Sequence, residues 1–259
     1  MFGKKELDRP LPNDAFVDSL ISEGKIFPDL AKLLKSIETS TSCGKEAKTS
    51  EKIKTVINFR NILKGTDFET GKIANIGSGF DWQFPVALGA ENIDMVDILF
   101  KEHSSIDKLL ASVKLFDLNA SLVSKSIPQV NFHINLSGKK RDITLSLYGV
   151  FSEDYLGQYK LNGVVESCGP TVHSIKPEGY VYNLPIAQKL IPRMTQNSFI
   201  INLDYNFCDS TNDYAAKGLK IIKRGGMKIA QIIDKEKVLK WVQISDKGKP
   251  IPLNPSLKR

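Results

Sequence analysis

Apolar residues near the start of the chain recur with the period of an α-helix. Residues 27–37 and residues 53–63 repeat Leu, Ile, Val, Ala or Phe every three or four positions, and Pro28 suits a first helical turn. Residues 39–50 between these segments are rich in Ser, Thr, Lys and Gly and have no such period. The pattern predicts two amphipathic helices joined by a linker, forming an N-terminal helical cap over residues 1–65.

Shorter apolar runs later in the chain predict the strands of a sheet. Residues 73–76 form one such run, and a second run ends on the acid Asp97. A helix is expected over residues 106–116, with Ser104 or Ser105 as its N-terminal cap.

Apolar and polar positions alternate over residues 130–136 and again over residues 143–149. The polar segment 137–142 separates them, so the pattern predicts a β-hairpin whose second arm continues as the third core strand. Residues 161–166 and 198–203 are expected to be the fourth and fifth strands.

The last part of the chain predicts that the sheet ends in antiparallel strands. A helix is expected over about residues 184–195 and another over about 212–223. Residues 227–233 and 238–244 follow as two apolar runs separated by a charged turn, which predicts an antiparallel closing hairpin.

Together these segments predict an α/β fold with one main domain over residues 66–245. We expect a Rossmann-like, seven-stranded, mostly parallel sheet that ends in an antiparallel hairpin, with an N-terminal helical extension. A helix and hairpin over about residues 100–141 form an insertion, and residues 246–259 form a proline-containing tail. A chain of 259 residues can bury one substantial core of this kind.

The glycine turn after the first predicted strand carries the main functional signal. Asn75-Ile76-Gly77-Ser78-Gly79 closes this strand, and Asp97 follows Gly77 by twenty positions at the end of the next one. The glycines allow a ligand to approach the backbone, and the acid can accept hydrogen bonds from ribose hydroxyls. The arrangement is typical of a site for a nucleoside-containing cofactor. A dinucleotide site would need a third glycine where this chain has Trp82.

This segment resembles motif I of class I S-adenosylmethionine-dependent methyltransferases. Their cofactor has no phosphate, so the third glycine is dispensable. The chain departs from the family pattern at Asn75, where an acid is common, and at Asp81, where a glycine is common. The closing hairpin is a second point of resemblance, and most dinucleotide-binding domains lack it.

The resemblance implies S-adenosylmethionine as cofactor and a set of residues that hold it. Either Glu153 or Asp154 would contact the adenine. Glu166 would lie where the fourth strand meets the methyl group and the acceptor. The other implied cofactor-binding residues are Asn75, Gly77, Ser78, Gly79, Phe80, Asp97 and Ile98.

Two residues after the fourth predicted strand are candidates for catalysis. Cys168 is either a nucleophile of the kind used in C5 methylation or an isolated buried thiol. His173 is either a general base or a loop histidine without a catalytic role. An Asn-Pro-Pro-Tyr or Asp-Pro-Pro-Tyr motif is missing from the sequence, which argues against methylation of adenine or cytosine amines.

Charge and cysteine content narrow the class of protein. The net charge of +7 permits an anionic partner, and the cluster Lys139-Lys140-Arg141 is either a nucleic-acid contact or a solvated hairpin turn. Cys43, Cys168 and Cys208 are odd in number and far apart, which argues against a disulfide framework and a zinc site. The sequence has no apolar run of membrane-spanning length and no secretory signal at its start, so we expect a cytoplasmic protein without a bound metal.

The sequence leaves three functions open. The leading hypothesis is an S-adenosylmethionine-dependent methyltransferase whose acceptor is a small molecule or RNA. A second is a catalytically degenerate protein of the same kind, which binds a cofactor or a partner. A third is an NAD-dependent oxidoreductase, disfavoured by Trp82 and by the closing hairpin.

Overall fold

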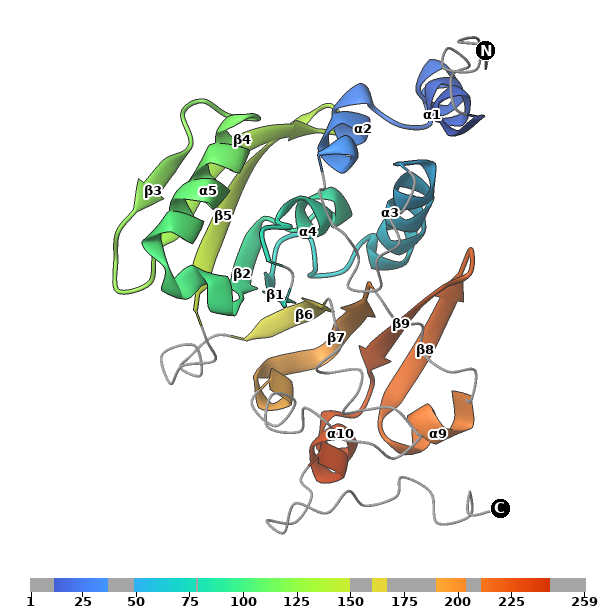
Figure 1. Cartoon of the computed structure of the whole chain (residues 1–259). Coiled ribbons are helices and arrows are strands. Elements are labelled where there is room, and N and C mark those ends of the chain that lie inside the picture. The colour runs from blue at the N-terminus through green and yellow to red at the C-terminus, as the bar shows by residue number, and fades with distance from the viewer. Residues whose placement is uncertain are drawn as a thin grey trace, which may run out of the picture.

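The computed structural model describes residues 12–36, 49–77, 79–149, 160–166, 190–203 and 211–242. These residues form a nine-stranded mixed sheet with helices packed against it (Figure 1). None of the described helices has the length and apolar character that crossing a membrane requires.

The elements keep the labels of Figure 1. The helices are α1 (Pro12–Ser22), α2 (Pro28–Lys35), α3 (Thr49–Leu63), α4 (Gln83–Leu88), α5 (His103–Lys114), α9 (Thr211–Ala216) and α10 (Lys235–Val242), with short 3-10 helices η1 (Ile98–Lys101) and η2 (Ile191–Arg193). The strands are β1 (Lys72–Ile76), β2 (Asn92–Val96), β3 (Ser121–Val123), β4 (Gln129–Leu136), β5 (Lys139–Tyr148), β6 (Leu161–Glu166), β7 (Met194–Asn202), β8 (Leu219–Arg224) and β9 (Met227–Ile232).

The centre of the sheet is a parallel block. Its strands β5, β2, β1, β6 and β7 are neighbours in that order. Parallel strands covered on both faces need apolar residues at nearly every position. Ile73 and Ala74 illustrate this, because these adjacent and fully buried residues belong to the two separate apolar clusters of the core. The short apolar runs of the sequence therefore correctly predicted β1, β2 and β6.

The direction in which the strands are added reverses beside β1. From β1 the chain moves outward to β2 and later to β5, whereas β6 and β7 are added on the other side of β1. The carboxyl ends of β1 and β6 therefore flank the reversal. In open α/β sheets, ligands bind in the crevice outside the strand ends at such a point.

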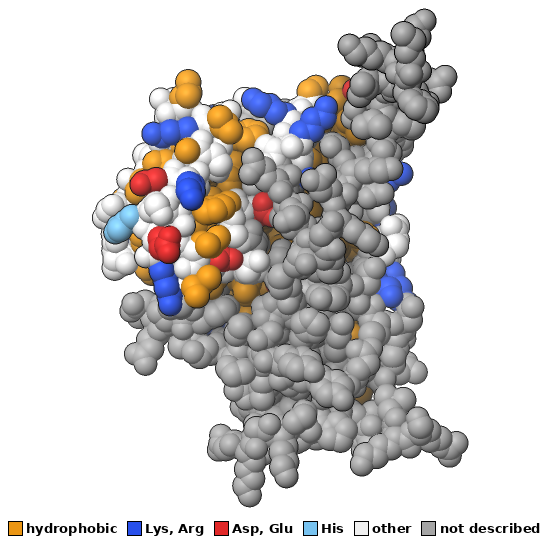
Figure 2. Space-filling model, in the orientation of Figure 1, with side chains coloured by type: hydrophobic (Ala, Val, Ile, Leu, Met, Phe, Trp, Pro, Cys, Tyr) orange, Lys and Arg blue, Asp and Glu red, His pale blue; other side chains and the backbone are white. Residues whose placement is uncertain are grey.

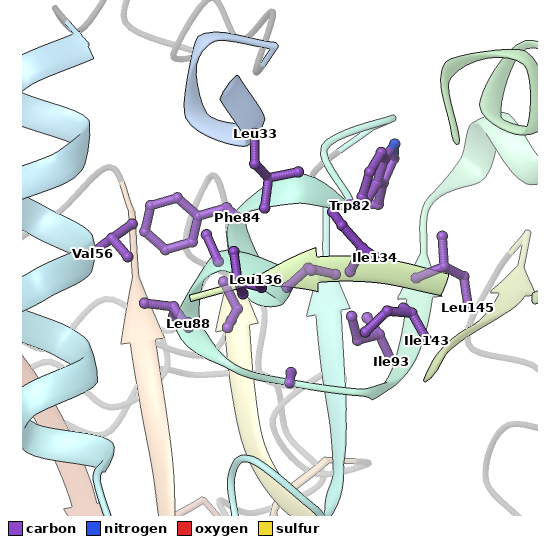
Figure 3. Close-up of a cluster of buried hydrophobic side chains, with 14 of the residues drawn as sticks. Leu33, Val56, Trp82, Phe84, Leu88, Ile93, Ile134, Leu136, Ile143 and Leu145 are labelled. Atoms are coloured by element: carbon purple, nitrogen blue, oxygen red, sulfur yellow. The ribbon is translucent and has the colours of Figure 1, made fainter. Parts of the chain in front are cut away.

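The predicted N-terminal helices are confirmed, and they cover one face of the sheet. Leu33 of α2, Val56 of α3 and Phe84 of α4 are buried in the same apolar cluster (Figure 3). Phe59 of α3 contacts Phe84 edge to face, with ring centroids 6.5 Å apart. The sequence did not predict α1, whose Val17, Leu20 and Ile21 side chains pack in the cluster. The predicted linker lies mostly outside the described residues.

The prediction of a seven-stranded, Rossmann-like, mostly parallel sheet is wrong. The described sheet has nine strands and antiparallel pairs at both ends. The predicted hairpin of β4 and β5 is confirmed, and β5 continues as a core strand parallel to β2. However, β4 and β3 extend the sheet beyond β5 as two further strands. The turn of this hairpin is only Ser137-Gly138, so residues 139–141 belong to β5.

The closing hairpin exists, and β9 confirms the strand predicted over 227–233, but its antiparallel partner precedes it in the chain instead of following it. Its strands are β8 and β9, joined at Gly225-Gly226, where both glycines have positive φ. The helix predicted over 212–223 ends at Ala216, and the strand predicted over 238–244 is helix α10 as far as it is described. Asp234 accepts a hydrogen bond from the backbone N–H of Lys237, a helix-capping contact that the sequence prediction overlooked.

Two helix boundaries also differ from the prediction. Glu102, rather than Ser104 or Ser105, is the N-cap of α5. The helix expected over 184–195 falls partly outside the described residues. Its predicted end is wrong, because η2 stops at Arg193 and Met194 begins β7.

Close packing against β6 generates a stability prediction. A Cβ atom on Gly163 would lie 2.8 Å from two ring carbons of Phe68, which is fully buried. We expect Gly163→Ala to lower the free energy of unfolding by about 1 to 3 kcal/mol, because the ring must shift within a packed core. Urea denaturation of Gly163→Ala, Phe68→Leu and the double variant measures this. The double variant should be more stable than the sum of the two losses predicts, and strict additivity would contradict the packing explanation.

Candidate functional site

Three predicted site residues lie at the carboxyl ends of neighbouring strands. Gly77 follows β1, Asp97 follows β2, and Glu166 ends β6. Because these strands are adjacent and parallel, their ends meet at one edge of the sheet, beside the point where the strand order reverses. The spacing of the motif in the sequence thus corresponds to one region of the fold.

The glycine turn is held by the end of β2. Gly77 and Gly79 have φ values of 63° and 57°, a left-handed conformation that favours glycine. The Gly77 N–H donates to the carbonyl oxygen of Val96 at 3.0 Å. The Gly79 N–H donates to Oδ2 of Asp97 at 2.9 Å. The backbone conformation explains why both positions are glycine, independently of any ligand.

Asp97 joins the glycine turn to the segment that follows β2. Its Oδ1 accepts from the backbone N–H of Leu99 at 3.0 Å, which caps η1, while its Oδ2 accepts from Gly79. An ionised carboxylate offers about four acceptor sites, so these two bonds leave capacity for two more donors. Asp97 is only half-buried. Its carboxylate can therefore hold the turn and still receive two ligand hydroxyls.

An apolar surface lies beside this carboxylate. Ile98 and Leu99 are 67% and 38% exposed, which is unusual for large aliphatic side chains in this protein. A Cβ on Gly79 would lie 3.8 Å from Leu99 Cδ1, so Leu99 borders the turn. Phe80 stacks edge to face on Phe100, with centroids 6.2 Å apart. The arrangement offers an apolar ledge against which a flat ring could pack.

Asn75 lies beneath the glycine turn. It is fully buried, and its Nδ2 donates to the carbonyl oxygen of Asp81 at 3.0 Å and to Sδ of Met95 at 3.3 Å. Its Oδ1 has no hydrogen-bond partner among the described residues. The side chain thus ties the far end of the turn to the strands. An aspartate at this position, as the family pattern has it, could not donate these bonds when ionised.

The surroundings of Trp82 and the start of α4 indicate whether a pyrophosphate could bind at the glycine turn. The indole is fully buried, donates to Oγ of Ser112 at 3.0 Å and packs against Phe116 and Phe132. Phosphate sites at helix starts use the backbone N–H groups of the first turn. Here the N–H of Trp82 donates to Phe80, and Pro85 has none. The start of α4 is therefore poorly equipped for a phosphate.

Glu166 is a fully buried carboxylate at the end of β6. It is level with Ile76 of β1 and Asn202 of β7 in the sheet register. Its Oε1 accepts from Nδ2 of Asn202 at 3.1 Å. The sequence had not singled out Asn202, although it lies near the end of the predicted fifth strand. Only the pairing of β6 with β7 brings the two side chains together.

Several predicted site residues lie outside the described residues. These are Ser78, Glu153, Asp154, Cys168 and His173. The structure therefore does not test the adenine contact or the two catalytic candidates. Among the residues that it does describe, no group of three or more His, Cys, Asp or Glu side chains could hold a metal ion.

The three residues of the basic cluster at the start of β5 differ in their exposure to solvent. Lys139 and Lys140 are exposed, whereas the Arg141 side chain is only 13% exposed. Arg141 donates to the carbonyl oxygen of Gly89 at 3.0 Å and pairs with Glu91 at 3.3 Å. The pKa of Arg60 is lowered by the burial of its own guanidinium and by the nearby charge of Arg141. Arg141 therefore stabilises the fold, and two exposed lysines remain of the predicted cluster.

Comparison with known proteins adds no assignment. The chain matches no model of a known protein family, and a search of curated proteins finds no match either.

A second acid of β2, Asp94, lies three residues before Asp97 and inside the core. Its side chain is 1% exposed, and its Oδ1 lies 2.9 Å from Nζ of Lys72. Burial raises the pKa of Asp94 to about 6, against the opposing effects of Lys72 and Arg193. Asp94 is thus inaccessible to a ligand, and its ionisation couples to folding.

The raised pKa of Asp94 predicts a pH-dependent stability. A raised folded-state pKa means that the folded protein binds the proton more tightly, so this contribution is complete below about pH 4 and is lost as pH rises through about 6. We expect Asp94→Asn to remove this decline. The stability of the native chain relative to the variant should fall by up to about 3 kcal/mol between those limits.

Urea unfolding at a series of pH values measures this difference. A Lys72→Met variant is a useful companion, because losing the nearby cation should move the decline to higher pH. Parallel stability curves for the native chain and Asp94→Asn would contradict the prediction.

Proposed function

We propose that the chain is an S-adenosylmethionine-dependent methyltransferase that acts on a small-molecule or RNA acceptor. The observation that carries the proposal is the contact between Gly79 and Asp97, which joins the glycine turn of β1 to the acid of β2. The contact lies beside the reversal of strand order, where α/β sheets bind ligands. Two acceptor sites of Asp97 suit the two hydroxyls of a ribose.

The apolar ledge supports the same cofactor. Ile98 and Leu99 directly follow the acid, so a ribose at Asp97 would bring its attached base toward them. Burying part of two exposed aliphatic side chains under a ring is favourable by roughly 25 cal/mol per Å². The ledge thus offers a reason for apolar side chains at exposed positions.

The methyl group of the cofactor is already activated on its sulfonium. The chain must therefore bind the cofactor, orient the acceptor and exclude water, and orientation supplies most of the rate. Glu166 and Asn202 are the described polar residues at the strand end nearest the proposed reaction centre. Cys168 and His173 follow β6 in the sequence and stay candidates for contact with the acceptor.

The proposal extends to location and partners. Three cysteines far apart in the sequence favour a reducing cytoplasm. An RNA acceptor is compatible with the positive net charge. The predicted cluster of Lys139, Lys140 and Arg141 gives it weaker support than expected, since Arg141 bonds within the fold.

Two other functions compete with this one. A degenerate binding protein would keep the turn and lack turnover, and the departures from the family pattern at Asn75 and Asp81 favour it. An NAD-dependent oxidoreductase would need a pyrophosphate at the glycine turn, and the start of α4 offers few donors for one. Calorimetry with S-adenosylmethionine, its demethylated product and NAD separates the oxidoreductase from the other two. Turnover against a panel of acceptors separates those two.

Substitution of Asp97 tests the cofactor site. We expect Asp97→Ala to weaken S-adenosylmethionine binding about ten- to a hundredfold, because roughly 1.5 to 3 kcal/mol of charge-assisted hydrogen bonding is lost. Losing the cap of η1 should also lower the free energy of unfolding by about 1 kcal/mol. Calorimetry and urea denaturation measure the two effects.

Asp117 provides a matched control for the loss of stability. Its carboxylate also accepts two backbone N–H bonds, from Asn119 at 2.9 Å and from His133 at 2.7 Å. We expect Asp117→Ala to lower stability similarly and to leave cofactor affinity unchanged. If the wild type binds the cofactor and Asp97→Ala binds it equally well, Asp97 is not part of the site.

A further inference from the structure

The outer half of the β8–β9 hairpin extends beyond the rest of the sheet. β8 and β9 pair from Leu219 opposite Ile232 to Arg224 opposite Met227. Among the described residues, β9 pairs with β7 only at Gln231 and Ala230. The hairpin tip therefore continues past the last contact with β7, and Figure 1 shows it beside α3.

This hairpin carries only positive charge. Residues 219–232 include four basic residues and no Asp or Glu, and these basic residues are Lys220, Lys223, Arg224 and Lys228. Lys223 lies directly opposite Lys228 in the register, which places their Cβ atoms about 5 Å apart. The two lysines therefore lie on the same face of the hairpin. By contrast, acidic and basic side chains are interspersed over α5 and β3 in Figure 2.

Helix α3 fixes the position of the hairpin tip. Nδ2 of Asn58 donates to the carbonyl oxygen of Gly225 at 3.4 Å. Gly225 has a φ of 54°, which favours glycine, and a Cβ there would lie 2.2 Å from that nitrogen and displace the Asn58 side chain. Lys54 is exposed and lies one helical turn before Asn58, hence on the same side of α3. The tip and this helix face together form one surface, called here the basic hairpin.

Protection of a sheet edge explains only part of this charge. β8 is an edge strand, and lysines on edge strands prevent pairing with other chains. That reason covers Lys220, Lys223 and Arg224. It does not cover Lys228, which belongs to the inner strand β9, or Lys54 on α3.

We propose that the basic hairpin binds the phosphate backbone of a single-stranded nucleic acid. Closely spaced cations on a rigid, extended element suit a chain of regularly spaced phosphates, and such contacts position a nucleic acid without reading its sequence. β7 is parallel to β1, since β6 pairs in parallel with both. β9 is antiparallel to both β7 and β8, so β8 has the same direction as β7 and β1. The tip therefore lies at the same edge of the sheet as Gly77 and Asp97.

Binding of labelled single-stranded RNA and DNA to the full chain, followed by fluorescence anisotropy over a salt series, tests the proposal. The test variant combines Lys223→Ala, Arg224→Ala and Lys228→Ala. We expect weaker binding and a salt slope about two units smaller, since each phosphate contact on a single strand contributes about 0.7. The RNA and DNA arms show whether the ribose hydroxyl matters. Thermal melting of the variant checks that it is folded before binding is compared.

The matched control combines Lys108→Ala, Lys114→Ala and Lys125→Ala, which removes the same charge from exposed positions outside both the basic hairpin and the cluster at the start of β5. This control should keep the native salt slope. Equal weakening in both triple variants would overturn the proposal, because net charge alone would then explain binding. Native affinity in the test variant, or binding of polyglutamate in place of nucleic acid, would also overturn it. The test variant should bind S-adenosylmethionine normally if it binds at all, so failure here is distinct from failure of the proposed function.

Discussion

The bond from the Gly79 N–H to the Asp97 carboxylate is the contact on which the candidate site depends. It joins the turn after β1 to the end of β2, while the second oxygen of Asp97 caps η1. A left-handed backbone at Gly77 and Gly79 makes the approach possible. The shape of this strand edge thus follows from two glycines and one carboxylate. Any ligand there meets two glycine N–H groups that hydrogen bonds to Val96 and Asp97 already hold, which reduces the entropy lost on binding.

Three buried polar side chains of the central strands are exceptions in an apolar core. Asn75, Asp94 and Glu166 lie on three adjacent strands, and each is at most 1% exposed. Burying such groups lowers stability unless hydrogen bonds or charges compensate. Asn75 supports the turn and Asp94 pairs with Lys72, so two of the three have a structural reason. Glu166 bonds to Asn202 at the point where strand order reverses, which is where a functional reason is easiest to justify.

The central strands and the glycine-acid pair could be predicted because both depend on local sequence. Buried parallel strands are short apolar runs in the sequence. Their carboxyl ends lie at the same edge of the sheet, independently of the conformation of the loops between them. The C-terminal elements could not be assigned by the same means. Residues 219–224 contain three apolar positions among three charged ones, which suits a strand or a helix equally, and only pairing with β9 makes them a strand. The hydrogen bond between Glu166 and Asn202 and the opposition of Lys223 and Lys228 were missed because strand register creates them.

Helix α3 connects the two proposed functional regions. Through Asn58 it holds the tip of the basic hairpin, and its Phe59 packs on Phe84 of α4, the helix that follows the glycine turn. Gln83 of α4 also donates to the carbonyl oxygen of Ser36, which ends α2. The N-terminal cap thus contacts both the hairpin and α4, the helix that follows the turn. If a nucleic acid binds at the hairpin and a cofactor at the turn, their separation is set by this rigid packing. An acceptor would then be chosen by which of its atoms reaches across that distance.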